Sequence, residues 1–219
     1  MADRAVAIFT AVQTEARAVA TALGVAAPTV DQPTVGLCGN TPIQLHLIGI
    51  RAPRLPVLDP VAVRCIIVAG LAGALDPSLR VGDLVVAGLG EGLQEGLRCR
   101  FGDIHASAAV VATPQEKAAL YARTGALAAD MEYDIVRGYA GRLGVPLVAV
   151  RAISDTAADF LDPALVRIVD EFGRARPRAI AAMLLGRPSM LPRLVQLAGN
   201  VRLAARRLAE IMPDLVSRL

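Results

Sequence analysis

Short apolar segments alternate with segments of helical periodicity along most of this chain. The clearest example lies between residues 130 and 155, where apolar side chains recur at helical spacing from Met131 to Leu143. Gly144 and Pro146 then end the helix, and a buried strand is predicted for 147–153. Strands that alternate with helices predict a single α/β domain with a central mixed, mainly parallel sheet flanked by helices.

The remaining elements follow from similar local signals. Thr113, Pro114 and Glu116 form the pattern of a capping box with proline at the first helical position, which predicts a helix from there to about Thr124. A second helix is predicted to end at Gly24, where glycine is the usual residue after a helix. The predicted strands are 4–12, 43–50, 65–69, 83–88 and 126–130, and the predicted helices are 13–23 and 114–124.

Composition limits the class of protein. A chain of 219 residues suffices for one sizeable core, so one domain is expected. The longest run of apolar residues and glycine, 65–75, is much shorter than a membrane span, and no basic segment leads into an apolar one near the start. Three cysteines without metal-like spacing fit a reducing compartment. We therefore expect a cytoplasmic protein without a membrane span, a secretory signal or a metal.

Positive charge is concentrated at the C-terminal end. From Arg174 onward there are nine arginines and two acidic residues. One helix is predicted from 163 to about 185 and another from about 190 to 212, and we divide the chain into a domain at 1–186 and a basic helical extension at 187–219. Nucleic acid is not an expected partner, because base-stacking aromatics are absent. The extension either contacts a membrane surface or lipid tail, or packs as a helix pair within the molecule or against another subunit.

Acidic residues lie at both ends of the unit between 130 and 155. Ser154 and Asp155 follow the predicted strand, at the edge where open α/β sheets place their chemistry. Glu132 starts the preceding helix, where an acid also favours the helix dipole, and Asp155 could equally be a turn or capping residue. Arg151 is harder to explain structurally, because a guanidinium inside an apolar strand needs an anionic partner.

Two further segments are candidates for the site. Glu15, near the start of the first predicted helix, has a capping role as its structural explanation. A glycine-rich segment after a predicted strand would let a ligand or backbone approach closely, but it lacks both the dinucleotide and the Walker pattern. The segment comprises Gly70, Leu71, Ala72 and Gly73.

The order of these segments resembles the nucleoside phosphorylase and nucleosidase superfamily. The resemblance extends from Glu15, at the position of the family's N-terminal acid, to about Asp159. Within the superfamily, the residues from Ala112 to Lys117 and from Thr124 to Ala126 look most like the hopanoid-associated phosphorylases. The segments that carry the resemblance are 70–77, 81–86, 130–132 and 150–155.

The resemblance implies a role for each candidate residue. Asp155 would donate a proton to N7 of a leaving adenine and Ser154 would orient it, while Glu132 would bind the ribose hydroxyls and Met131 would pack against the sugar. Arg151 and the backbone of Gly70, Leu71, Ala72 and Gly73 would face the nucleophile, which is either phosphate or a water held by Glu15. No cofactor is implied besides phosphate as co-substrate.

Three functions remain open at this stage. The first is a phosphorylase, a pentosyltransferase that removes adenine from a lipid-linked nucleoside, adenosylhopane, in hopanoid biosynthesis. The second is a hydrolytic nucleosidase for 5′-methylthioadenosine or S-adenosylhomocysteine, and the third is a non-catalytic nucleoside-binding relative. The segment from Gly49 to Pro56 departs from the family, because its prolines preclude the long helix usual there. Family members generally form oligomers, so a homo-oligomer is expected.

Overall fold

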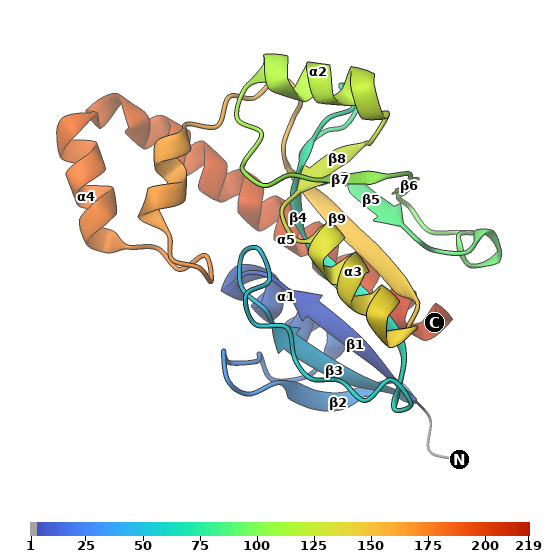
Figure 1. Ribbon diagram of the computed structural model, residues 1–219. Coiled ribbons are helices and arrows are strands. Elements are labelled where there is room, and N and C mark those ends of the chain that lie inside the picture. The colour runs from blue at the N-terminus through green and yellow to red at the C-terminus, as the bar shows by residue number, and fades with distance from the viewer. Residues whose placement is uncertain (1–3) are drawn as a thin grey trace.

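The computed structural model describes residues 4–219, which form one mixed sheet between two layers of helices (Figure 1). The main path of the sheet has the order β2-β3-β1-β4-β9-β5-β6, and β8 pairs with both β4 and β7. The predicted α/β architecture with a mainly parallel sheet is confirmed. The strands are β1 (Ala5–Thr10), β2 (Thr34–Cys38), β3 (Thr41–Leu47), β4 (Val63–Ala74), β5 (Leu84–Ala87), β6 (Arg100–Phe101), β7 (Ile104–Ala106), β8 (Ala128–Asp130) and β9 (Leu147–Asp155).

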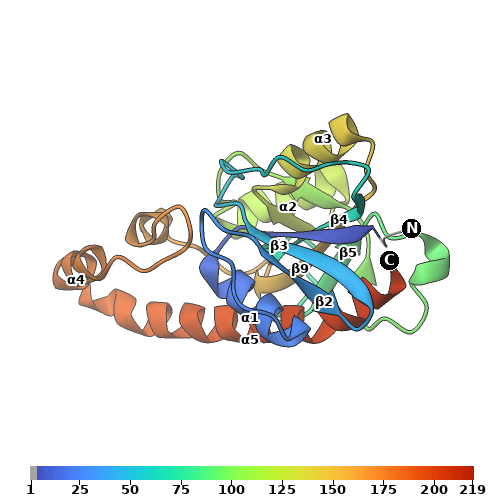
Figure 2. The same ribbon diagram turned by 90° about the horizontal axis from the view of Figure 1, so that it is seen from below.

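The helices lie on both faces of this sheet. Figure 2 shows α1 and α5 side by side on one face and α3 on the other. The second half of α5 contributes Ala204, Leu208 and Met212 to the core on the first face, and Val136 of α3 belongs to the core on the second. The helices are α1 (Gln13–Leu23), α2 (Pro114–Thr124), α3 (Tyr133–Leu143), α4 (Pro177–Gly186) and α5 (Leu191–Arg218), with short 3₁₀ turns η1 (Glu91–Leu93), η2 (Pro163–Ile168) and η3 (Pro188–Met190).

Two helices, α1 and α2, have an end at the residue that local sequence signals predict. The Thr113 hydroxyl accepts a hydrogen bond from the Glu116 amide at 3.1 Å, and the Glu116 carboxylate accepts one from the Thr113 amide at 3.0 Å. This capping box starts α2 at the predicted residue. Gly24, with φ of 70°, ends α1 where the sequence predicts.

The predicted helix over 163–185 is confirmed only in its second half. Only a 3₁₀ turn forms at η2, and α4 begins at Pro177. Between them the Asp170 carboxylate accepts hydrogen bonds from the Phe172 and Arg174 amides, both at 2.9 Å. Gly173 adopts φ of 70° in the same turn, so the chain reverses where a helix would have continued.

The C-terminal helix is longer than predicted. Helix α5 continues through Pro213 to Arg218, because the residues around the proline are buried against the sheet and tertiary packing maintains the helix. No helix within residues 4–219 is both long and apolar enough to cross a membrane. The boundary at residues 186 and 187 stays a prediction.

Candidate active site

The C-terminal ends of β4 and β9 place the candidate residues together. The two strands are parallel neighbours, and their register pairs Gly70 with Arg151 and Gly73 with Asp155. Strand β4 is longer than predicted, so the glycine-rich segment is part of the strand and not a loop after it. Strand β9 likewise runs through Asp155. The site is therefore built on regular strands, at the sheet edge that the sequence pattern indicated.

The two glycines of this segment leave room for two carboxylates. A Cβ atom on Gly70 would lie 2.9 Å from Glu15 Oε1, and one on Gly73 would lie 2.8 Å from Asp155 Oδ2. Real Cβ atoms do not approach oxygen so closely, so any larger residue would displace an acid. Glycine is needed here for close approach inside a strand, and not for a turn.

Asp155 is a buried carboxylate with a partner on each oxygen. The Ser154 hydroxyl donates to Oδ1 at 2.9 Å, as expected for a serine that orients the acid. The ammonium group of Lys117, from α2, donates to Oδ2 at 2.5 Å. Both members of this ion pair are buried, with side-chain exposures of 1% for Lys117 and 6% for Asp155. The lysine is a member of the site that sequence reasoning missed.

Arg151 has an anionic partner within the protein, as its position in an apolar strand requires. Its Nε and Nη2 both donate to Asp130 Oδ2. Its Nη1 donates to the carbonyl oxygens of Val68 and Val150 at 2.9 and 3.2 Å. The side chains of Arg151 and Asp130 are each 1% exposed. Most donors of this guanidinium are therefore used internally, and its predicted role at the nucleophile stays a prediction.

Glu132 lies between this ion pair and the loop after β3. Its Oε1 accepts a hydrogen bond from the Arg51 amide at 2.8 Å. Burial raises the pKa of Glu132, and the nearby Arg151 charge opposes that shift. The loop reaches the acid because Gly49, Arg51 and Ala52 all adopt positive φ values of 79°, 63° and 49°. The sequence indicated only that this segment lacks a helix, and not that it closes on the site.

Glu15 is held by backbone amides at the centre of the site. Its Oε2 accepts from the Ala11 and Val12 amides at 2.9 and 3.0 Å, and its Oε1 accepts from the Leu71 amide at 2.8 Å. Burial raises the pKa of Glu15 to about 7 despite these hydrogen bonds. The carboxylate of Glu15 caps the start of α1 and also contacts β4. Glu15 is therefore both the capping residue that the sequence suggested and a residue of the candidate site.

The raised pKa of Glu15 predicts a change in stability with pH. Because its pKa in the folded protein, about 7, exceeds the ordinary value of 4.5, the folded state binds the extra proton between these values. Stability from this group is therefore lost as pH rises from 5 to 8, by roughly 3 kcal/mol. The free energy of unfolding of Glu15→Gln should lack this loss, so between pH 5 and pH 8 it should rise relative to that of the wild type by roughly 3 kcal/mol. Urea unfolding at both pH values measures this difference.

The matched control for this measurement is Glu91→Gln, which changes an exposed glutamate. It should leave the pH dependence of unfolding as in wild type. Comparing variants with wild type also cancels the contribution of His46, whose pKa burial lowers to about 4. An unchanged pH dependence in Glu15→Gln would contradict a protonated, buried Glu15 near neutral pH.

The charges of the site divide into paired and unpaired groups. Asp130 is paired with Arg151 and Asp155 with Lys117. Glu15 and Glu132 interact with each other and with the Arg151 charge, but neither has an ion pair of its own within the described residues 4–219. In that part of the chain no group of three histidine, cysteine or acidic side chains is arranged to bind a metal. Such a site can donate and accept protons and bind hydroxyl groups.

Sequence reasoning missed three contributors, namely Lys117, the pairing role of Asp130, and the Arg51 amide. The sequence contained a signal for Lys117 and for Asp130. Lys117 is the only lysine in a chain rich in arginine, and Asp130 ends the predicted strand 126–130, in the same unit as a buried arginine that needed a partner. The loop conformation that brings in Arg51 has no comparable signal, because two of its positive φ values occur at residues other than glycine. Met131 is half-buried beside Glu132, and its predicted role stays a prediction.

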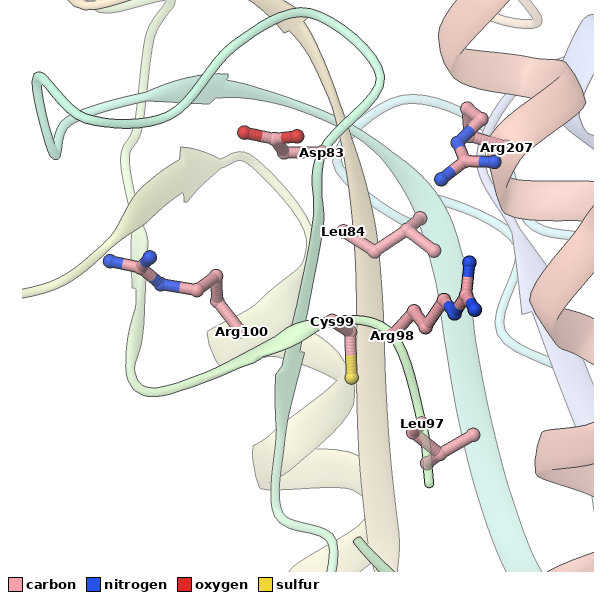
Figure 3. A pocket seen from close by; sticks show the side chains of 7 residues that line it. All are labelled: Asp83, Leu84, Leu97, Arg98, Cys99, Arg100 and Arg207. Atoms are coloured by element: carbon pink, nitrogen blue, oxygen red, sulfur yellow. The ribbon is translucent and has the colours of Figure 1, made fainter. Parts of the chain in front are cut away.

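A separate cavity of about 360 Å³ lies between α5 and the segment that leads into β6. In Figure 3 the guanidinium groups of Arg98 and Arg207 point toward each other across it. Arg207 donates to Glu210 at 2.6 Å. None of the acids at the ends of β4 and β9 lines this space, so it is not the candidate active site. Its lining residues are Asp83, Leu84, Leu97, Arg98, Cys99, Arg100 and Arg207.

Comparison with known proteins supports the resemblance to the nucleoside phosphorylase and nucleosidase superfamily. Residues 89–185 match the model of the Phosphorylase superfamily. Among solved structures, the 5′-methylthioadenosine/S-adenosylhomocysteine nucleosidase of Helicobacter pylori has a TM-score of 0.72 at 17% identity, with 100% of both chains covered. The futalosine hydrolase of Helicobacter pylori has a TM-score of 0.70 at 18% identity, covering 99% of this chain and 98% of the other.

The S-adenosylhomocysteine nucleosidase of Streptococcus pyogenes, solved with 5-methylthiotubericidin, also has a TM-score of 0.70 at 18% identity, covering 100% of this chain and 98% of the other. A comparison with curated proteins found no match. At these identities the structural likeness establishes the fold. The fold is that of nucleoside phosphorylases and nucleosidases, as the sequence predicts, while the hopanoid-associated branch stays a prediction.

Proposed function

We propose that this protein cleaves the N-glycosidic bond of an adenine nucleoside. The observation that carries the proposal is the convergence of Asp155, Glu132 and Glu15 at the ends of two neighbouring strands, each buried and each held by specific hydrogen bonds. The nucleosidases of similar fold named above, one of them solved with a bound nucleoside analogue, support adenine nucleosides as the substrate class.

The leaving base requires a proton, and the ribose develops positive charge as the bond breaks. Asp155 pairs with Lys117 as a carboxylate, so it would first take up a proton from water and then donate it to N7, with the Ser154 hydroxyl holding the carboxyl group at 2.9 Å. Glu132 would accept hydrogen bonds from the ribose hydroxyls, and Met131 beside it would pack against the sugar. The negative charge of Glu132, and that of Glu15 in its ionised form, favour a cationic ribose, because opposite charges attract strongly in a site shielded from water.

The charges of the site favour water as the nucleophile. Glu15 has a pKa of about 7, which suits a general base that accepts a proton from water near neutral pH. Arg151 directs Nε and Nη2 to Asp130, and the Glu132 carboxylate, together with Glu15 when it is ionised, would repel a phosphate ion. Hydrolysis, as by a nucleosidase for 5′-methylthioadenosine or S-adenosylhomocysteine, therefore fits this arrangement best.

The test is adenine release by the purified protein from adenosine, 5′-methylthioadenosine and S-adenosylhomocysteine, measured by chromatography in phosphate-free buffer. Hydrolysis predicts adenine and the free ribose product in equal amounts. Failure to release adenine from any adenine nucleoside, with or without phosphate, would contradict enzymatic function and would favour a non-catalytic nucleoside-binding relative.

Phosphorolysis is the second candidate function, and one observation favours it. The Arg51 amide contacts Glu132, so the loop that carries the exposed Arg51 side chain reaches the site and could bring a positive charge to phosphate. Adenosylhopane would then be the substrate to test. A sugar phosphate product that forms only when phosphate is added would establish this function, and would replace hydrolysis as the proposed reaction.

The basic helices after residue 174 are proposed to contact an anionic membrane surface. No acidic residue occurs from 172 to 209, while Leu185 and Val195 are 87% and 65% exposed. Exposed apolar side chains among arginines are typical of surface-bound amphipathic helices. Flotation with phosphatidylglycerol vesicles should therefore be lost in Leu185→Glu. Equal flotation of this variant and the wild type would support the alternative expected from the sequence, a helix pair that packs within the molecule or against another subunit.

A further inference from the structure

Lys117 is a buried ammonium group with three oxygen partners. Besides Asp155 Oδ2 at 2.5 Å, it donates to the carbonyl oxygens of Thr156 and Asp159 at 2.7 and 3.3 Å. Three partners match the three N–H donors of an ammonium group. Its position is therefore determined by its contacts, and all three lie in the segment 155–159.

The same segment forms a closed turn. The Asp159 carboxylate accepts hydrogen bonds from the Thr156 amide at 2.7 Å and from the Thr156 hydroxyl at 2.8 Å. Lys117 contacts the carbonyl groups at both ends of this turn, as well as the carboxylate of Asp155 that precedes it. Any movement of the lysine would thus be transmitted to the acid and to the turn together.

Helix stability does not explain a lysine at this position. Lys117 lies near the N-terminus of α2, where the helix dipole disfavours positive charge. Burial of an ammonium group also carries a desolvation cost, which only oxygen partners can offset. The contacts with the segment 155–159 compensate for both costs. The lysine therefore stabilises that segment and not the helix in which it lies.

We propose that Lys117 is a positioning residue for Asp155 in the cleavage reaction. This inference rests on the proposed function. The ammonium group holds Oδ2 while Ser154 holds Oδ1, so the carboxyl plane is fixed from both sides. It also anchors the turn through Thr156 and Asp159. Orientation of the acid toward the base then depends on a residue in a different element, α2, that does not itself touch the substrate.

The inference can be tested with two ribosides whose leaving groups differ in their need for a proton. Adenine departs as a neutral base only when N7 is protonated, whereas 4-nitrophenolate departs as a stable anion. Substitution of a residue that acts through Asp155 should therefore lower kcat for adenosine and leave kcat for 4-nitrophenyl riboside nearly unchanged. A residue that merely stabilises the fold should affect both substrates alike.

We expect Lys117→Met to lower kcat for adenine release about 100-fold, with a change of no more than about threefold for 4-nitrophenyl riboside. Lys117→Arg retains a positive donor, so it should recover much of the lost rate. Equal losses on both substrates, or an unchanged rate of adenine release, would overturn the positioning role. A wild-type protein that cleaves neither substrate would instead contradict the proposed function.

A second measurement does not depend on the folding of Lys117→Met. Because Lys117 is the only lysine, labelling with ¹³C-lysine yields a single Cε signal in the wild-type protein. Addition of adenine should shift this signal in the wild type and shift it much less in Asp155→Asn. A Cε signal that does not respond to adenine bound by the wild-type protein would overturn the inference.

Discussion

Asp155→Asn should lower kcat for adenine release by about 10² to 10⁴-fold, the usual contribution of a positioned general acid. The amide cannot give up a proton to N7, yet it has nearly the same shape as the carboxyl group. Its oxygen can still accept from Lys117, which donates to Oδ2 at 2.5 Å in the wild type. The shape of the site should therefore change little and KM should stay within a few-fold, although Lys117 loses its anionic partner and the variant should be less stable than the wild type.

The control for this variant is Asp31→Asn, which makes the same chemical change at a side chain that is 85% exposed. Its kcat should equal that of the wild type. Circular dichroism of both variants at the assay temperature, below the Tm of each, establishes that any loss of kcat is catalytic. If Asp155→Asn retained more than about a tenth of the wild-type kcat, the assignment of Asp155 as the proton donor would have to be abandoned.

Arg151→Met should destabilise the protein by about 3 to 5 kcal/mol, the usual cost of leaving one member of a buried ion pair without its partner. The Asp130 side chain is 1% exposed and would lose two charge-assisted hydrogen bonds. The carbonyl oxygens of Val68 and Val150 would lose their donor as well. Urea unfolding at pH 7 measures this loss.

The double variant Arg151→Met with Asp130→Asn should recover part of this stability, because it removes the unpaired charge. Arg137→Met is the matched control, since Arg137 pairs with Asp134 at 2.7 Å on the exposed surface of α3. That variant should cost less than about 1 kcal/mol. A loss for Arg151→Met as small as that of Arg137→Met would show that the buried pair is not a major source of stability.

The parts of the fold that depend on local signals could be predicted from the sequence. The bounds of α2 follow from Thr113, Pro114 and Glu116 at one end and Gly125 at the other, and each of these residues acts through neighbours within one helical turn. Parallel pairing of buried strands followed from their apolar composition. The short strands β2, β6 and β7 were missed, because their residues do not form a continuous apolar run like those that revealed β5 and β8.

The glycine-rich segment shows where local interpretation fails. Gly70 and Gly73 follow the predicted strand 65–69, and the sequence indicated only that a ligand or backbone approaches closely there. In the protein both lie within β4, because carboxylates from α1 and β9 approach the strand at these positions. The reason for each glycine is a residue far away in sequence, Glu15 for one and Asp155 for the other.

By itself, the sequence determined the α/β architecture, the strand end that carries Ser154 and Asp155, and the need of Arg151 for an anionic partner, because each depends on periodicity or on the character of a single side chain. Only the tertiary structure decided which partners meet. It paired Arg151 with Asp130, joined Lys117 to Asp155 across 38 positions, and closed the Arg51 loop on Glu132. Such long-range contacts depend on strand register and loop geometry, which local sequence does not encode.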